Sequence, residues 1–272
     1  MEAPDTIIRL LLTVQYDGAG FRGWQLQPDQ RTVQGTLEDA LSRLADRACS
    51  VLGSGRTDTG VHALGQVASV DMPAKWSAEE LHRALNATLP GDMWVEAVRP
   101  AQPDFHPRYD AVSRTYRYDV GTQPSSASPF HSRWCWPLGE DVDSGLLHEG
   151  AALLPGRHSF AAFSKAGQPE PGEACTVASA AWSEWLLGYR LTITADRYLH
   201  HMVRYLVGTM VDVARGRRPL TDITGLLRKE PGLVTSPPAP PQGLFLSHVE
   251  YPEGVLLGHG SSAPPSRRAA AV

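Results

Sequence analysis

Apolar residues recur along the chain with two different spacings, and the order in which the spacings alternate indicates the fold class. Residues 7–16 form a run of leucine and β-branched residues that is typical of a strand. Leu37, Leu41 and Leu44 recur at helical spacing behind Thr32, which is a good N-cap residue. Such patterns predict strand, helix, strand, strand, helix and strand over residues 7–16, 33–48, 49–55, 65–72, 77–89 and 93–100.

The pattern restarts in the second half. It predicts strand, helix, strand pair, long amphipathic helix, short helix and final strand over residues 111–120, 143–154, 176–196, 199–215, 221–229 and 243–252. The similar order predicts an α/β protein of the α+β type, with two similar domains that each have a mostly antiparallel sheet with helices on one face. We place these domains at residues 5–108 and 109–252, followed by a disordered tail at 253–272.

Composition excludes few functions. The net charge of −4 is weak evidence against RNA binding, because a local basic patch is hidden in the sum. The three cysteines are far apart and form no C-x-x-C pair, which predicts neither a disulfide framework nor a zinc–cysteine site. Arg9 interrupts the N-terminal apolar run, and no stretch approaches the roughly 20 apolar residues of a membrane span. We therefore expect a cytoplasmic protein without a membrane segment.

The segment SGRTDTGVHALGQ contains the triplet DTG at residues 58–60, by which aspartic proteases present a catalytic carboxylate. A protease needs two such carboxylates that share a proton, but the DSG at 143–145 precedes a helical pattern and is predicted to be an N-cap. Arg56 would also keep Asp58 ionised, which opposes proton sharing. A protease is disfavoured, and taken alone the segment indicates a turn in which Asp58 caps its own backbone and Gly60 is left-handed.

The surroundings of the triplet resemble the tRNA pseudouridine synthases of the TruA type. The hallmark of that family is a Gly-Arg-Thr-Asp-x-Gly-Val-His loop, here residues 55–62. Further segments resemble the family in its order, namely YDGAGFRGWQLQ (16–27), TVQGTLEDAL (32–41), LNATLPGDMWV (85–95), FHPRYDAVSRTYRY (105–118), HSFAAF (158–163), HHMVRYLVG (200–208) and GLFLSHVEYP (243–252). Thr59 departs from the common alanine, and residues 164–176 lack an arginine often found in an RNA-contacting loop.

The resemblance implies an enzyme that isomerises uridine to pseudouridine in the anticodon stem-loop of tRNA, at positions 38, 39 and 40. The reaction breaks the N1–C1′ glycosidic bond, turns the uracil and rejoins it through C5, so it requires a nucleophile or charged partner beside the sugar and a proton acceptor. By resemblance Asp58 is the nucleophile, in a cleft between the two domains. Attack at C1′, attack at C6 and assistance through a glycal stay open.

Three further residues receive roles from the resemblance. Arg204 forms an ion pair with Asp58 that keeps the carboxylate ionised, although without the family it would be interpreted as a surface arginine. Arg56 flips the target uridine out of its stem and fills the vacated space, with a plain pairing to Asp58 as the alternative. Tyr116 stacks on the uracil.

Phosphate contacts supply most of the affinity for RNA. The predicted substrate-binding residues are Tyr116, Phe105, His106, Pro107, Arg108, Tyr109, Arg114 and Lys165. A basic cluster at Arg215, Arg217 and Arg218 is a further candidate. For any single basic residue of these sets, a solvated surface charge is the simplest alternative.

The adjacent His200 and His201 raise the question of a metal site. On the predicted helix 199–215 their side chains would point about 100° apart, and neither has a partner at i+4 that completes a zinc motif. We therefore expect no metal ligands, and the resemblance implies no cofactor. It also implies a homodimer whose two clefts cooperate in holding one tRNA.

A tRNA pseudouridine synthase is thus the first hypothesis. A non-catalytic RNA-binding or chaperone-like relative is the second. An aspartic protease is the third and least favoured.

Overall fold

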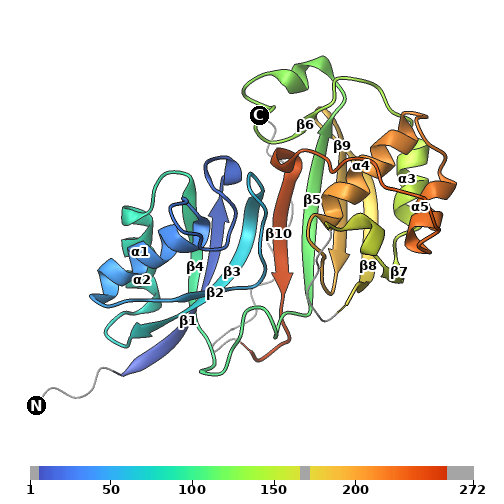
Figure 1. The fold of residues 1–272 in the computed structure, drawn as a ribbon. Coiled ribbons are helices and arrows are strands. Elements are labelled where there is room, and N and C mark those ends of the chain that lie inside the picture. The colour runs from blue at the N-terminus through green and yellow to red at the C-terminus, as the bar shows by residue number, and fades with distance from the viewer. Residues whose placement is uncertain (1–5, 166–171, 256–272) are drawn as a thin grey trace, which may run out of the picture.

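The computed structural model describes residues 6–165 and 172–255. Its strands are β1 Ile7–Tyr16, β2 Val51–Gly53, β3 His62–Pro73, β4 Met93–Pro100, β5 Ser113–Gly121, β6 Trp136–Pro137, β7 Gly156–Ser159, β8 Ala174–Trp185, β9 Gly188–Ala195 and β10 Leu244–Glu250. They form one sheet in the order β4-β1-β3-β10-β5-β9-β8-β7, with β2 beside β3 and β6 beside β5 (Figure 1). Most neighbouring strands are antiparallel, and the exceptions are β3 with β10 and β5 with β6.

The helices cover the sheet in two groups. They are α1 Val33–Ala45, α2 Ala78–Thr88, α3 Ser144–Ala152, α4 Met202–Ala214 and α5 Thr221–Leu227. Figure 1 shows α1 and α2 over the half of the sheet that contains β4, β1 and β3, and α3 and α4 over the half that contains β5, β9 and β8. The mixed fold with a mostly antiparallel sheet and helices on one face is as the sequence predicts.

Local capping signals set the helix ends in the N-terminal half. The Thr32 hydroxyl accepts a hydrogen bond from the backbone of Gly35 and caps α1, and Ser77 with Glu80 forms a reciprocal capping box at α2. Helix α1 ends three residues before its predicted end, because Asp46 adopts a left-handed conformation with φ of 52°. The apolar faces of these helices and Leu10, Leu12 and Val14 of β1 are buried in one core.

The C-terminal half differs more from its prediction. Helix α4 begins at Met202 and not at residue 199, because His201 has φ of 65° and cannot continue a right-handed helix. The short strands β6 and β7 were not predicted. Asp143 caps α3 as expected, since its side chain accepts a hydrogen bond from the backbone N–H of Leu146 at 3.1 Å.

The last strand joins the two halves. β10 pairs antiparallel with β5, and on its other side Phe245 and Leu246 lie opposite His62 and Ala63 of β3 in a short parallel pairing. The chain end of one predicted domain therefore completes a sheet shared with the other. The division into domains at residues 5–108 and 109–252 stays a prediction.

The cysteines, the question of a membrane span and the C-terminal tail were also subjects of prediction. Cys49, Cys135 and Cys175 are free and buried, as the lack of a disulfide pattern predicted. Among the described helices, none has both the length and the apolar character required to cross a bilayer. From residue 256 on, the predicted disordered tail lies outside the described residues, as do residues 166–171 of the loop 164–176.

Candidate active site

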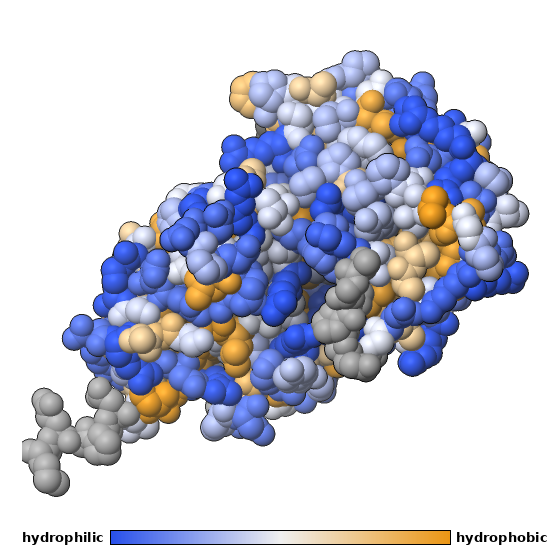
Figure 2. All heavy atoms as spheres, viewed as in Figure 1, coloured by the Kyte–Doolittle hydropathy of each residue, from blue (hydrophilic) through white to orange (hydrophobic). Residues whose placement is uncertain are grey.

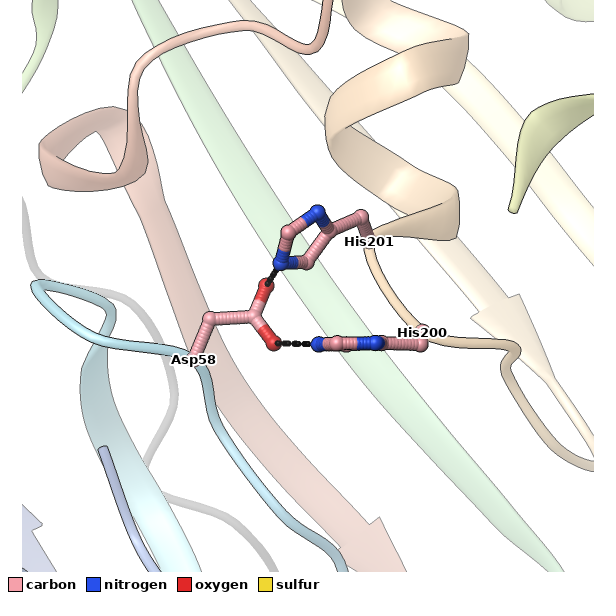
Figure 3. Close-up of side chains that lie close together, drawn as sticks. All are labelled: Asp58, His200 and His201. Carbon is pink, nitrogen blue, oxygen red and sulfur yellow. Dashed lines mark ion pairs between the residues drawn. The ribbon is translucent and has the colours of Figure 1, made fainter. Parts of the chain in front are cut away.

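The segment between β2 and β3 presents Asp58 by a tight turn. The backbone N–H of Val61 donates to the carbonyl of Asp58 at 3.1 Å, and Gly60 has φ of 80°. A left-handed glycine at this point is the feature that the sequence predicted. The hydrogen bond that closes this turn uses the backbone of Asp58, and its carboxylate is directed instead toward the residues that precede α4 (Figure 3).

A buried hydrogen-bond network supports this loop from below. The hydroxyls of Tyr16 and Thr57 are 2.8 Å apart, and the Gln66 amide donates to the carbonyl of Gly55 at 3.0 Å. Ser54 donates to the side-chain oxygen of Gln66 at 2.7 Å. Burial raises the pKa of Tyr16 to about 12, so its hydroxyl stays protonated and bonded. The network thus holds Gly55 and Thr57, the residues on either side of Arg56, in place. Thr57 directly precedes Asp58.

The Asp58 carboxylate faces cationic and imidazole groups from the C-terminal half. Nη1 of Arg204, in the first turn of α4, lies 3.5 Å from Oδ2, and Nε of the same guanidinium donates to the carbonyl of Ala239 at 2.7 Å. Nε2 of His200 lies 3.4 Å from Oδ1, and Nε2 of His201 lies 3.4 Å from Oδ2. Figure 3 shows the two imidazoles converging on the carboxylate, one at each oxygen. The carboxylate therefore has one guanidinium and two imidazoles as polar neighbours.

The two histidines correct one premise of the sequence analysis. Neither lies within α4, because His201 is the N-cap residue and His200 precedes it, so the helical separation of about 100° does not apply. Their rings lie side by side with centroids 4.1 Å apart. Burial lowers the pKa of His201, with Asp58 opposing the shift and His200, Arg204 and Lys165 adding to it.

Tyr116 of β5 lies near the Asp58 carboxylate. Its ring is 9% exposed and packs edge-on against Tyr198, with centroids 4.8 Å apart. Burial raises the pKa of Tyr116, and the nearby Tyr16 phenol and Asp58 carboxylate add to this effect, so the Tyr116 phenol is neutral. Within the described part of the chain its hydroxyl has no hydrogen-bond partner. A neutral aromatic ring at this depth is suited to packing on a base.

Arg56 lies apart from this group. Its side chain is exposed and makes no hydrogen bond or ion pair with any described residue. The structure thus brings Arg204 to Asp58 and does not bring Arg56 to it. Arg56 is the cation of the loop that remains available to a ligand.

The segment FHPRY divides into a buried and an exposed part. Phe105 is 1% exposed and packs on the ring of Tyr251, whose hydroxyl donates to the carbonyl of Pro107. Tyr109 is 75% exposed and lies against the ring of His106, with centroids 4.2 Å apart. The Arg108 guanidinium lies 5.7 Å from the centre of the same Tyr109 ring. The rings of His106 and Tyr109 and the charge of Arg108 are available to a ligand. In contrast, Phe105 and Pro107 contact Tyr251 and stabilise the fold.

The other predicted RNA contacts have varied surroundings. The Arg114 guanidinium donates to four carbonyls, those of Ser54, Arg108, Ala111 and Asp196. This residue therefore ties the active-site loop to three other segments, and its donors are used within the protein. Lys165 is exposed, and its backbone N–H donates to the carbonyl of His200 at 3.2 Å, which places it beside one of the two histidines that face Asp58.

The predicted basic cluster of the C-terminal half is paired with acidic residues. Arg215 contacts Glu140, Arg217 contacts Asp212 and Arg218 contacts Asp222.

On the face of the molecule in Figure 2, hydrophilic residues gather around the depression between the two halves. The Asp58 carboxylate thus lies among a guanidinium and two imidazoles, with the buried ring of Tyr116 nearby.

Two groups of residues were missed by the sequence reasoning. The support network of Tyr16, Ser54 and Gln66 depends on the pairing of β1 with β3, which the periodicity does not specify. The approach of His200 and His201 to Asp58 depends on a left-handed residue that breaks a helical pattern. The adjacent HH pair was the available signal.

Comparison with known proteins gives the family. The family model described as tRNA pseudouridine synthase matches residues 12–110 and 151–252. A protein named tRNA pseudouridine synthase A from Methylacidiphilum infernorum is 38% identical over 90% of this chain and 96% of its own length, and one of the same name from Solidesulfovibrio magneticus is 40% identical over 89% and 91%. A third of that name, from Porphyromonas gingivalis, is 35% identical over 92% of this chain and 99% of its own length. The chain belongs to the tRNA pseudouridine synthase family.

Proposed function

We propose that the protein isomerises uridine to pseudouridine in the anticodon stem-loop of tRNA, at positions 38, 39 and 40, with Asp58 as the nucleophile. The observation that carries the proposal is the Asp58 carboxylate, held 3.5 Å from Arg204 and near the buried ring of Tyr116. Membership of the family and relatives named tRNA pseudouridine synthase A support the substrate class.

The roles follow from the surroundings of each residue. Arg56 has no partner among the described residues, so it is available to enter the space that a flipped uridine leaves. Tyr116 supports the face of the uracil while the base is detached and turned. Arg204 keeps the carboxylate ionised and oriented toward the sugar or the base. His106, Arg108, Tyr109 and Lys165 supply contacts to the RNA backbone and bases at the rim of the cleft.

Release of tritium from tRNA labelled at uridine C5 tests the proposal, because the C5 proton is lost when the C5–C1′ bond forms. We expect Asp58→Ala to reduce release by about a thousandfold or more, with tRNA affinity largely kept. Asp39→Ala, at an exposed position of α1, is the matched control and should release label at the wild-type rate. Wild-type protein that binds tRNA and releases no label would make it a non-catalytic RNA-binding relative.

Position and assembly need separate measurements. Transcripts in which uridine 38, 39 or 40 is replaced by cytidine should each lose label at that position alone.

A cytoplasmic homodimer is also part of the proposal, and exposed apolar side chains such as Phe130 and Leu186 are available for an interface. Sedimentation at low concentration should give twice the mass of 29.5 kDa.

A further inference from the structure

The Asp58 carboxylate faces two imidazoles as well as a guanidinium. One ligand atom each from Asp58, His200 and His201 lies within 4.8 Å of the others (Figure 3). We propose that these three side chains bind a divalent transition metal ion, for which Zn²⁺ is the probe, and that the bound ion is a reversible inhibitor of the isomerase. The binding stands on the geometry alone, whereas the inhibition rests on the proposed function.

The distances are close to those of a metal site. Zinc binds imidazole nitrogen and carboxylate oxygen at about 2.0–2.2 Å, which separates the ligand atoms of a tetrahedral site by about 3.3–3.6 Å. Both nitrogen–oxygen separations of the cluster are 3.4 Å. A small rotation of the imidazoles toward each other would complete the arrangement, and the carboxylate can bind through one oxygen or both.

The donor set selects the class of metal. Two imidazoles and one carboxylate form the ligand set of open zinc sites and of the non-haem iron(II) facial triad. Mg²⁺ and Ca²⁺ prefer oxygen ligands throughout, so they should bind poorly here. Three protein ligands leave at least one coordination position for water.

The backbone holds the two histidines toward the carboxylate. His201 is left-handed at the N-cap of α4, and the carbonyl of His200 accepts a hydrogen bond from the backbone of Lys165. The side chains of His200, His201 and Asp58 are 48%, 20% and 19% exposed, so an ion can reach them from solvent. The cluster is thus both formed and accessible.

Arg204 opposes the bound ion. Its Nη1 lies 3.5 Å from Asp58 Oδ2, and a cation at the cluster would feel the repulsion of the guanidinium. We therefore expect weaker binding than at a closed structural zinc site, and removal by a chelator. Arg204→Ala should bind Zn²⁺ more tightly than the wild type, by about tenfold or more. The same substitution should therefore raise the affinity for Zn²⁺ while it lowers the turnover of the isomerase.

Inhibition follows from the use of the same oxygens. Lone pairs of Asp58 that coordinate a metal are not available to attack the nucleotide, and the ion would occupy the space beside the carboxylate that the nucleotide needs. The RNA and the metal should therefore exclude each other.

The test is a titration of metal-free protein, without a histidine tag, with Zn²⁺ against a chromophoric chelator in the absence of RNA. We expect one ion per chain, at least tenfold weaker binding in His200→Asn and His201→Asn, and unchanged binding in His148→Asn, at an exposed position of α3. Co²⁺ should report the same site by visible absorption that both active-site variants lose. Equal titrations of the wild type and the two active-site variants would overturn the site.

A second measurement separates the site from the proposed function. The apparent inhibition constant of Zn²⁺ in the tritium-release assay should rise with tRNA concentration and, extrapolated to zero tRNA, should match the dissociation constant. Binding without inhibition would overturn the inhibitory role of the ion but not the metal site. A wild-type protein without isomerase activity would contradict the proposed function, and the metal titration would still test the site.

Discussion

Arg204 contacts both Asp58 and the chain that leads into β10. Its Nη1 lies 3.5 Å from the carboxylate, and its Nε donates to the carbonyl of Ala239. The guanidinium is thereby held in one orientation by a backbone group that belongs neither to the loop that carries Asp58 nor to α4. An ion pair with a guanidinium fixed in this way orients the Asp58 carboxylate.

We expect Arg204→Ala to reduce turnover by about a hundredfold and tRNA affinity by much less, because the charge acts on the reacting carboxylate. Arg204→Lys should recover only part of the activity, since one ammonium group cannot replace two separate guanidinium contacts. Single-turnover rates and filter-binding affinities measure the two effects. A large loss of affinity at normal turnover would make Arg204 a phosphate contact instead.

The network below the loop predicts a split between stability and rate. Ser54→Ala leaves the buried side-chain oxygen of Gln66 with one partner fewer and should cost about 1–3 kcal/mol of unfolding free energy. Ser126→Ala is the matched control, because the Ser126 hydroxyl is also buried and donates to the carbonyl of Gly121. Both variants should unfold at lower denaturant concentration, and Ser54→Ala alone should reduce the maximal rate. Equal rates in the two variants would show that the network only stabilises the fold.

A close approach of two loops predicts an intolerant glycine. Gly23 has φ of 88°, and a Cβ there would lie 2.7 Å from the carbonyl oxygen of Thr57, the residue directly before Asp58. Gly23→Ala should destabilise the protein by about 1–3 kcal/mol and displace the loop, with loss of turnover. Gly91→Ala has open space at its Cβ and is the control. Urea unfolding and tritium release on both variants test the point, and a wild-type rate in Gly23→Ala would contradict it.

The parts of this fold that the sequence predicts correctly are those set by residues a few positions apart in the chain. The bounds of β1 and β4 and the caps of α1, α2 and α3 follow from β-branched runs and from Thr32, Ser77 and Asp143, each of which acts within a few residues. The place of β10 between β3 and β5 is a long-range pairing, for which a single strand pattern contains no partner.

The candidate site divides in the same way. The loop motif pointed to Asp58, and the resemblance pointed to Arg204 and Tyr116, which the fold brings together. The conformation of His201 was not readable, because a helical pattern of apolar residues continues across it and only tertiary contacts favour a left-handed histidine there. The burial of Phe105 likewise depends on Tyr251, more than a hundred residues away in the chain. Side-chain chemistry was thus predictable where a motif carried it, and orientation was not.

His62, the last residue of the loop motif, predicts a pH dependence of stability. Burial lowers its pKa, with Asp17 opposing the shift, and its Nδ1 accepts the backbone N–H of Gly18 at 3.0 Å. Below about pH 6.5 the unfolded chain binds a proton at this residue that the folded protein resists, so the free energy of unfolding should fall as the pH falls from about 7 to 5.5. In His62→Asn, whose side-chain oxygen can accept the same hydrogen bond, this slope should be smaller. Urea titrations at several pH values measure it, and equal slopes would exclude His62 as the source.

Tyr116 separates the role of a ring from that of a hydroxyl. Its pKa is raised by burial and its hydroxyl has no partner among the described residues, so the phenol is neutral and is not positioned by the protein as a base. Tyr116→Phe keeps the ring and should retain turnover within about tenfold, whereas Tyr116→Ala removes the surface on which the uracil rests and should lose about a hundredfold or more. Because Tyr116→Ala also opens a cavity that costs about 3–5 kcal/mol, rates must be compared at a temperature where circular dichroism shows both variants folded. If Tyr116→Phe were as inactive as Tyr116→Ala, the hydroxyl and not the ring would be the functional group, and proton transfer through Tyr116 would become part of the mechanism.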